Sequence, residues 1–81
     1  MRRLVGRNLR RFRAAAGLTQ EQLSARTGFP QQHISEIERG HGNPTVLTLY
    51  EIGLALGVTP VDLVSPDQEA ERESPPAVRK F

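Results

Sequence analysis

The sequence predicts an all-α domain of five short helices followed by a polar tail. Apolar residues recur at steps of three and four through the first 64 positions, which is the spacing of one buried stripe on a helix. Glycine and threonine mark the expected ends and starts of these helices. A chain of 81 residues is long enough for one small domain. The expected stops are Gly17, Gly28, Gly40 and Gly57, and the expected caps are Thr19, Thr45 and Thr59.

The first helix is expected to end at Gly17, because glycine readily adopts the left-handed conformation that follows a helix. Its predicted buried stripe consists of Leu4, Val5, Leu9, Phe12, Ala15 and Ala16. Arginine fills most of the remaining positions: Arg2, Arg3, Arg7, Arg10, Arg11 and Arg13.

The second helix is expected to begin at Thr19, with Thr19 and Gln22 forming a capping box. Leu23 is its apolar anchor and Gly28 its end. The third helix, opened by Phe29-Pro30, is expected over about residues 30–39. Only Ile34 and Ile37 are apolar there, so this helix should bury a narrow stripe and expose nearly everything else.

Thr45 is the expected cap of a fourth helix, whose predicted buried face carries Val46, Leu49, Gly53 and Leu56, flanked by Tyr50 and Leu54. Gly53 is expected to mark close packing, since glycine is costly inside a helix. Thr59 and Pro60 start a last, very short helix that contains Leu63 and Val64. Two interpretations remain open for Leu47, Tyr50 and Val61, which belong either to the core of the monomer or to a dimer interface.

The composition changes after Ser65, which divides the chain into a domain at residues 1–65 and a tail at residues 66–81. The domain carries eight arginines and five acidic residues, a formal charge of +3, whereas the tail carries −1. Proline and polar residues dominate the tail, so we expect a flexible segment. The folded part is therefore the basic part.

Cysteine is absent, which excludes disulfides and thiolate metal sites. No apolar run is long enough to cross a bilayer or to form a signal peptide, so a cytoplasmic protein with no membrane association is expected. His33 and His41 lack further partners for a metal site. No nucleophile–base pair, phosphate-binding loop or metal set indicates an enzyme, and no cofactor or small-molecule ligand is expected.

Two short helices joined at Gly28, the second mostly polar, are typical of a helix-turn-helix. Further motifs follow the same order along the chain: LTQEQL at residues 18–23, Gly28, ISEIERG at 34–40, NPT at 43–45 and LALGV at 54–58. At these positions the chain resembles the phage-repressor and Cro-type (XRE-like) DNA-binding family. The resemblance covers roughly Leu4 to Val64. It implies a compact five-helix bundle of the lambda-repressor-like type that binds double-stranded operator DNA, usually as a two-fold symmetric homodimer.

The resemblance places base contacts on the third helix, at Gln31, Gln32, Ser35 and Glu36. The chemistry is suitable, because a glutamine amide pairs with the edge of adenine through two hydrogen bonds and a glutamate accepts from the amino group of cytosine. Contacts to DNA phosphates are expected from the start of the second helix and from basic or polar residues around it. These residues are Gln20, Arg7, Arg10, Arg11, Arg26, His33, Arg39 and Asn43.

The family often pairs an arginine late in the first helix with a glutamate late in the third, and Arg13 and Glu38 occupy those positions. We therefore expect a shielded ion pair with a structural role. The sequence also departs from the family pattern. Pro30 replaces the usual Ser or Thr cap, and Ser24 and Thr27 make the turn more polar.

The favoured function is a sequence-specific transcriptional regulator that binds a palindromic operator as a homodimer. A repressor, or a controller of the kind that accompanies restriction–modification genes, fits this description. The alternative is a protein-interaction module, such as an antitoxin-like subunit, because acidic, proline-rich tails can fold on a partner.

Overall fold

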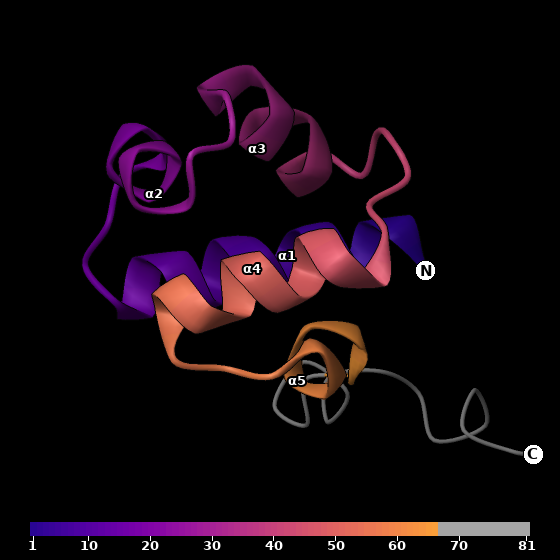
Figure 1. Cartoon of the computed structure of the whole chain (residues 1–81). Coiled ribbons are helices and arrows are strands. Elements are labelled where there is room, and N and C mark those ends of the chain that lie inside the picture. The colour runs from indigo at the N-terminus through magenta and orange to yellow at the C-terminus, as the bar shows by residue number, and fades with distance from the viewer. Residues whose placement is uncertain (67–81) are drawn as a thin grey trace, which may run out of the picture.

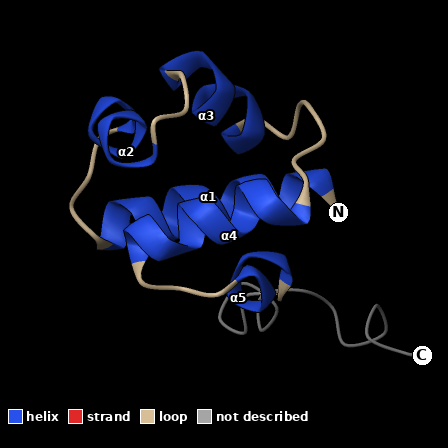
Figure 2. Ribbon diagram, in the orientation of Figure 1, coloured by secondary structure: helices blue, strands red, loops and turns tan. Residues whose placement is uncertain are grey.

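The computed structural model describes residues 1–66 and contains five α-helices and no strand within that range (Figures 1 and 2). This confirms the predicted all-α fold class. The remaining residues of the predicted tail lie outside the described part of the chain. The helices are α1 (Arg2–Ala15), α2 (Gln20–Thr27), α3 (Gln31–Glu38), α4 (Val46–Leu56) and α5 (Pro60–Val64).

The helices surround one small core. Helix α1 packs against α3 and α5, α2 packs against α3 and α4, and α4 packs against α5. Figure 1 shows α2 and α3 on one side of the two longer helices α1 and α4, with α5 on the opposite side. The buried apolar side chains come from all five helices: Val5, Leu9, Leu23, Ile34, Ile37, Leu49, Ile52 and Leu63.

Side-chain caps fix the starts of α2 and α5. The hydroxyl of Thr19 accepts a hydrogen bond from the backbone N–H of Gln22 at 3.0 Å, and Gln22 Oε1 accepts one from the backbone N–H of Thr19 at 2.8 Å. Thr59 and Asp62 form a second capping box at the start of α5. Gly28 ends α2 in the left-handed region at φ 82°. Both ends of α2 are therefore set by local sequence, as predicted.

The predicted burial pattern was wrong at several positions. Val46 is 74 % exposed and Ile52 is fully buried, so the inner face of α4 is Leu49, Ile52 and Gly53. Ala15 and Ala16 are exposed at the end of α1. These differences share a cause: helical spacing permits more than one stripe, and tertiary contacts decide which stripe is buried.

Two small or polar residues of α1 are buried in place of large apolar ones. A Cβ atom on Gly6 would lie 2.4 Å from the carbonyl oxygen of Ile37 and 2.7 Å from that of Glu38. The backbones of α1 and α3 thus approach too closely for any side chain at Gly6. In α4, a Cβ atom on Gly53 would lie 2.4 Å from the carbonyl oxygen of Val58. Gly53 therefore packs closely against the segment that follows α4.

Asn8 is the second such residue, and its side chain is completely buried. Its amide nitrogen donates to the carbonyl oxygens of Leu63 at 2.9 Å and Ser65 at 2.7 Å, with a longer contact to Asp62 at 3.5 Å. A helix end leaves carbonyl groups without partners inside the helix. Asn8 satisfies those of α5 and fixes the short helix against α1.

Candidate nucleic-acid interface

Helix α3 presents its glutamines to solvent. Ile34 and Ile37 are 0 % and 2 % exposed, whereas Gln31 and Gln32 in the first turn are exposed. The two isoleucines face the core. The helical period places Gln32 opposite them and Gln31 at the edge of the buried face, where the open first turn of the helix exposes it. Helix α3 begins at Gln31 and ends at Glu38, one residue inside the predicted range at each end.

The other α3 residues predicted to contact bases or phosphate are less exposed, and two of them make side-chain contacts within the domain. Ser35 and Glu36 are half-buried, and Ser35 Oγ accepts a hydrogen bond from Arg39 Nη1 at 2.8 Å. The ring of His33 packs edge-on against Phe29, with 5.6 Å between ring centroids. Gln31 and Gln32 are therefore the most accessible of the predicted base-contacting residues.

The turn between α2 and α3 is held by the two polar residues that depart from the family pattern. Ser24 Oγ donates to the carbonyl oxygen of Phe29 at 2.5 Å. Thr27 Oγ1 donates to the carbonyl oxygen of Leu23 at 2.9 Å and accepts from the backbone N–H of Phe29 at 3.2 Å. Pro30 precedes α3 without a side-chain cap. Hydrogen bonds within the turn thus orient α3 where the capping hydroxyl is missing.

Glu38 is a buried carboxylate shared by three helices. Its Oε2 lies 2.5 Å from Arg13 Nε, and its Oε1 accepts from Arg13 Nη2 at 3.0 Å and from Gln20 Nε2 at 2.9 Å. Arg10 Nε is 3.7 Å from Oε1. The Glu38 side chain is 0 % exposed and that of Arg13 is 16 % exposed.

These contacts keep Glu38 ionised. Burial acts to raise the pKa of its carboxyl group, but hydrogen bonds from Arg13 and Gln20, together with the charges of Arg13 and Arg10, hold the pKa below its ordinary value of 4.5. The same hydrogen bond raises the pKa of Arg13. The charged pair therefore joins α1 to α3 at neutral pH.

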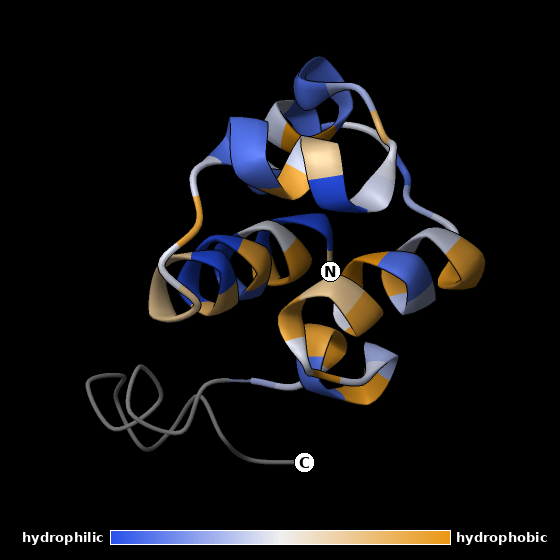
Figure 3. Cartoon of the chain, turned by 60° about the vertical axis from the view of Figure 1, so that its left-hand side comes forward, coloured by the Kyte–Doolittle hydropathy of each residue, from blue (hydrophilic) through white to orange (hydrophobic). Residues whose placement is uncertain are grey.

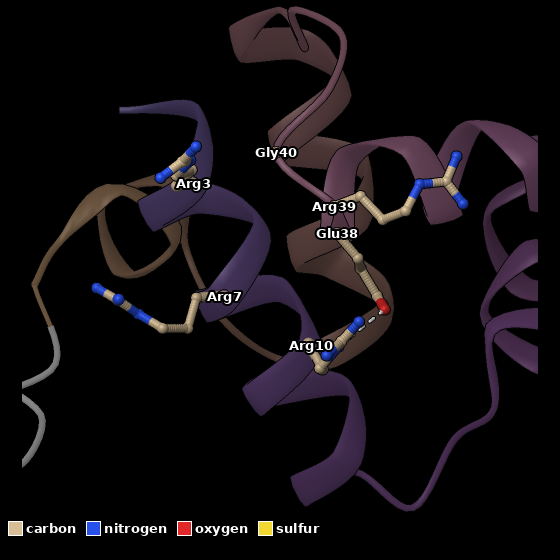
Figure 4. Close-up of a pocket in the computed structure, with 6 residues that line it drawn as sticks. All are labelled: Arg3, Arg7, Arg10, Glu38, Arg39 and Gly40. Atoms are coloured by element: carbon tan, nitrogen blue, oxygen red, sulfur yellow. Dashed lines mark ion pairs between the residues drawn. The ribbon is translucent and has the colours of Figure 1, made fainter.

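The residues expected to contact phosphate do not form one group. Arg7, Arg10 and Arg39 line one cavity with Glu38 and Gly40 (Figure 4). Arg26 lines a different cavity, against α4, together with Thr27, Glu51, Leu54 and Ala55.

Arg11, Gln20 and Asn43 lie outside both groups. The guanidinium of Arg11 bonds Asn8 Oδ1 at 3.3 Å and lies 4.4 Å from the centre of the Phe12 ring. The amide nitrogen of Gln20 is directed at Glu38, whereas Asn43 is exposed in the loop before α4.

Sequence reasoning left Arg3 and Asn8 without a role. Arg3 lines the arginine cavity, and its Cγ would lie 3.1 Å from a Cβ on Gly40. Arg3, Arg7 and Arg10 are spaced by four and three residues, which places them on one helix face. This spacing could have predicted that Arg3 lies beside the other two. Nothing in the sequence pattern marked Asn8, because its partners are backbone carbonyls more than fifty positions away.

Within residues 1–66, no helix is both long and apolar enough to cross a membrane. The same residues contain no cluster of three or more His, Cys, Asp or Glu side chains placed to hold a metal ion.

A family model described as helix-turn-helix matches residues 9–63 of this sequence. The chain belongs to this helix-turn-helix family. The match includes α2, the turn and α3, which are the elements that carry the exposed glutamines and the Glu38 contacts.

Individual helix-turn-helix proteins agree with this assignment. The chain is 58 % identical over 69 residues to the HTH-type transcriptional regulator y4dJ of Sinorhizobium fredii, covering 85 % of this chain and 90 % of that protein. The crystal structure of the hypothetical transcription factor NHTF from Neisseria matches with a TM-score of 0.80 and 30 % identity, over 90 % of this chain and 84 % of that one. The restriction-modification controller protein C.AhdI from Aeromonas hydrophila matches with a TM-score of 0.73 and 31 % identity, over 76 % and 94 % of the two chains.

Proposed function

We propose that this chain is a non-catalytic, sequence-specific DNA-binding transcriptional regulator that acts as a homodimer on a palindromic operator. One observation carries the proposal: Gln31 and Gln32 are exposed in the first turn of α3, while Ile34 and Ile37 fix the opposite face in the core. A major groove about 12 Å wide admits one helix, and outward glutamine amides can pair with adenine edges. The relatives, which include an HTH-type transcriptional regulator and a restriction-modification controller protein, support the same function.

Residues around α3 supply the proposed contacts to the DNA backbone. The start of α2 at Gln20 presents backbone N–H groups and the positive end of the helix dipole, which favour a phosphate. Arg7, Arg10, Arg39 and the exposed Asn43 add cationic or polar groups nearby. Arg11, Arg26 and His33 complete the proposed phosphate contacts. In the unbound chain Arg11 also donates to Asn8 Oδ1, and Arg26 borders a separate cavity against α4.

An exposed apolar face supports the homodimer. Leu47, Tyr50 and Leu54 of α4 and Val61 of α5 are 68 %, 49 %, 61 % and 67 % exposed. Figure 3 shows hydrophobic residues gathered on α4 and α5, whereas α3 is largely hydrophilic. Apolar groups gathered on one face of a small domain indicate a contact surface. A second copy of the chain would cover this face by a two-fold contact and present two α3 helices to successive major grooves about 34 Å apart.

Selection of bound fragments from random-sequence duplex DNA tests the proposal. The selected fragments are expected to contain two inverted half-sites with centres about 10 base pairs apart. Their sequences would show the base preference, and their inverted arrangement would show the symmetry of the dimer. Equal affinity for every duplex at physiological salt would reject sequence-specific binding. A stoichiometric protein partner that co-purifies and covers the apolar face would favour the interaction-module alternative.

A further inference from the structure

The cavity between α1 and the end of α3 brings three of the proposed phosphate contacts together with Arg3. It has a volume of about 190 Å³ and is lined by Arg3, Arg7, Arg10, Glu38, Arg39 and Gly40. We propose that this arginine cavity binds a single phosphate group of the DNA backbone, with Arg3 as a contacting residue. The inference rests on the proposed DNA-binding function and adds a defined phosphate site to it.

The charges at the cavity do not balance. Four guanidinium groups border it, and the carboxylate in its wall, Glu38, already receives two hydrogen bonds from Arg13. Arg10 pairs with this carboxylate at 3.7 Å. Within residues 1–66, the structure gives Arg3 and Arg7 neither an ion pair nor a side-chain hydrogen bond. The surplus positive charge favours an anion.

The arginines also disfavour α1 when the cavity is empty. Arg3 and Arg7 are four residues apart and Arg7 and Arg10 three apart, and like-charged pairs at such spacing destabilise a helix. Helix α1 has no acidic residue in its first turn, so positive charge also lies at the positive end of the helix dipole. A bound phosphate would relieve both repulsions, and a bidentate guanidinium–phosphate contact is stronger than a neutral hydrogen bond.

The side chains leave the cavity open. In Figure 4, Arg10 alone is turned to Glu38, while Arg7 and Arg39 extend away from it on different sides. A Cβ atom on Gly40 would lie 3.1 Å from Cγ of Arg3, and the left-handed Gly40 at φ 79° keeps the turn after α3 close to α1. Long arginine side chains can rotate inward around an anion of phosphate size without a change in the backbone. Because Arg39 and Gly40 directly follow α3, a phosphate held here would lie beside the groove that α3 enters.

A pair of neighbouring substitutions tests the site in the full-length chain. Arg3→Gln and Arg2→Gln each remove one positive charge from the first turn of α1, but only Arg3 lines the cavity. Affinity for the selected operator and for a random duplex is measured between 50 and 200 mM salt. One phosphate contact contributes about 0.9 to the slope of log affinity against log salt concentration. The factor by which salt weakens binding over this range should therefore be about three- to fourfold smaller for Arg3→Gln than for the unmodified protein. Arg2→Gln should show less than half of that change.

Operators in which one phosphate at a time is replaced by an uncharged methylphosphonate then locate the contact. One position per half-site should weaken the unmodified protein and Arg2→Gln equally, and should weaken Arg3→Gln less, because Arg3→Gln has already lost one contact to that phosphate. Arg7→Gln repeats the comparison at the second guanidinium, so that a folding defect in one variant does not decide the result. Inorganic phosphate, titrated without DNA at physiological salt, should not bind at submillimolar concentration.

The outcomes separate this inference from the proposed function. Specific operator binding with identical salt slopes for Arg3→Gln, Arg7→Gln and Arg2→Gln would overturn the cavity assignment alone. Tight binding of free inorganic phosphate, without any methylphosphonate position that depends on Arg3, would reassign the cavity to a soluble anion. Absence of any sequence preference in the unmodified protein would reject the proposed function itself.

Discussion

Gln20, the first residue of α2, donates a hydrogen bond from Nε2 to Oε1 of Glu38, the last residue of α3, at 2.9 Å. The same carboxylate is held by Arg13 of α1. One buried charge therefore fixes the relative placement of the two helices of the helix-turn-helix and attaches both to α1. The Gln20 side chain is oriented by this contact. The backbone N–H groups of Gln20 and Glu21, which the capping box does not use, serve the proposed phosphate contact.

Glu38→Gln is expected to lower the free energy of unfolding by about 3 kcal/mol. Breaking a buried pair costs about 3–5 kcal/mol because the remaining charge is uncompensated. The lower end applies because the Arg13 side chain keeps 16 % exposure. Urea denaturation monitored by circular dichroism measures the change. Glu36→Gln removes a charge of the same sign from the same helix at a half-buried position and should change stability by less than about 0.5 kcal/mol. Equal effects of the two variants would contradict a structural role for the pair.

Stability should also fall at acidic pH through Glu38. The pKa of this carboxyl is lower in the folded chain than its ordinary value of 4.5, so below that value the unfolded chain binds more protons. The contribution of Glu38 is therefore fully present above about pH 5.5, about one unit above that ordinary pKa, and is lost as the pH falls through the lowered pKa of the folded state. Denaturation curves recorded from pH 7 to pH 3 should show a shallower decline for Glu38→Gln. Parallel declines in both proteins would show that other carboxyl groups control the acid sensitivity.

Local signals made most of the fold predictable. Thr19 with Gln22, Gly28, and Thr59 with Pro60 set helix ends through contacts within four residues, and the structure has each of them. The burial of α4 was harder to predict, because the choice between Val46 and Ile52 depends on where α2 and α5 pack. Sequence spacing carries no information on that choice when both faces of a helix are apolar.

The candidate site was predictable to a similar extent. Ile34 and Ile37 determined which side of α3 faces outward, so the exposure of Gln32 followed from local spacing, and that of Gln31 from its place in the first turn. The cavity lined by Arg3 and Arg39 did not follow, because it requires the contact between α1 and the turn after α3. That contact depends on Gly6, whose close approach to the α3 backbone becomes visible only in three dimensions.

Asn8→Ala is expected to destabilise the domain by about 2–3 kcal/mol, because it leaves buried carbonyl groups at the end of α5 without a donor. Amide hydrogen exchange should report the loss locally, with faster exchange in α5 than in α2. Asn43→Ala, at an exposed loop position, is the matched control and should leave stability within about 0.5 kcal/mol. Uniform acceleration of exchange in all helices would show that α5 is not held separately by Asn8.

The double variant Gln31→Ala/Gln32→Ala should lose specific binding and retain its fold. Each bidentate amide–adenine contact contributes about 1–3 kcal/mol of discrimination, which is roughly 5- to 150-fold in relative affinity. Fluorescence anisotropy with the selected operator and a random duplex should show a reduced specificity ratio and an unchanged salt slope. The circular dichroism spectrum should match that of the unmodified protein, because both side chains are exposed. Unfolding of the variant would show that these side chains support the bundle instead of facing DNA.

The apolar face of α4 provides the test of the homodimer. Leu54→Lys places a charge on a side chain that is 61 % exposed, so the monomer should fold normally. A two-fold interface contains each substituted position twice, and both charges would be desolvated on association. We therefore expect sedimentation velocity to show a dimer for the unmodified protein and a monomer for Leu54→Lys at the same concentration. Ala15→Lys makes the same kind of change at an exposed position of α1 and should remain dimeric. Operator affinity should fall with loss of the dimer, because one α3 helix then contacts one half-site; a dimer that persists in Leu54→Lys would place the interface elsewhere.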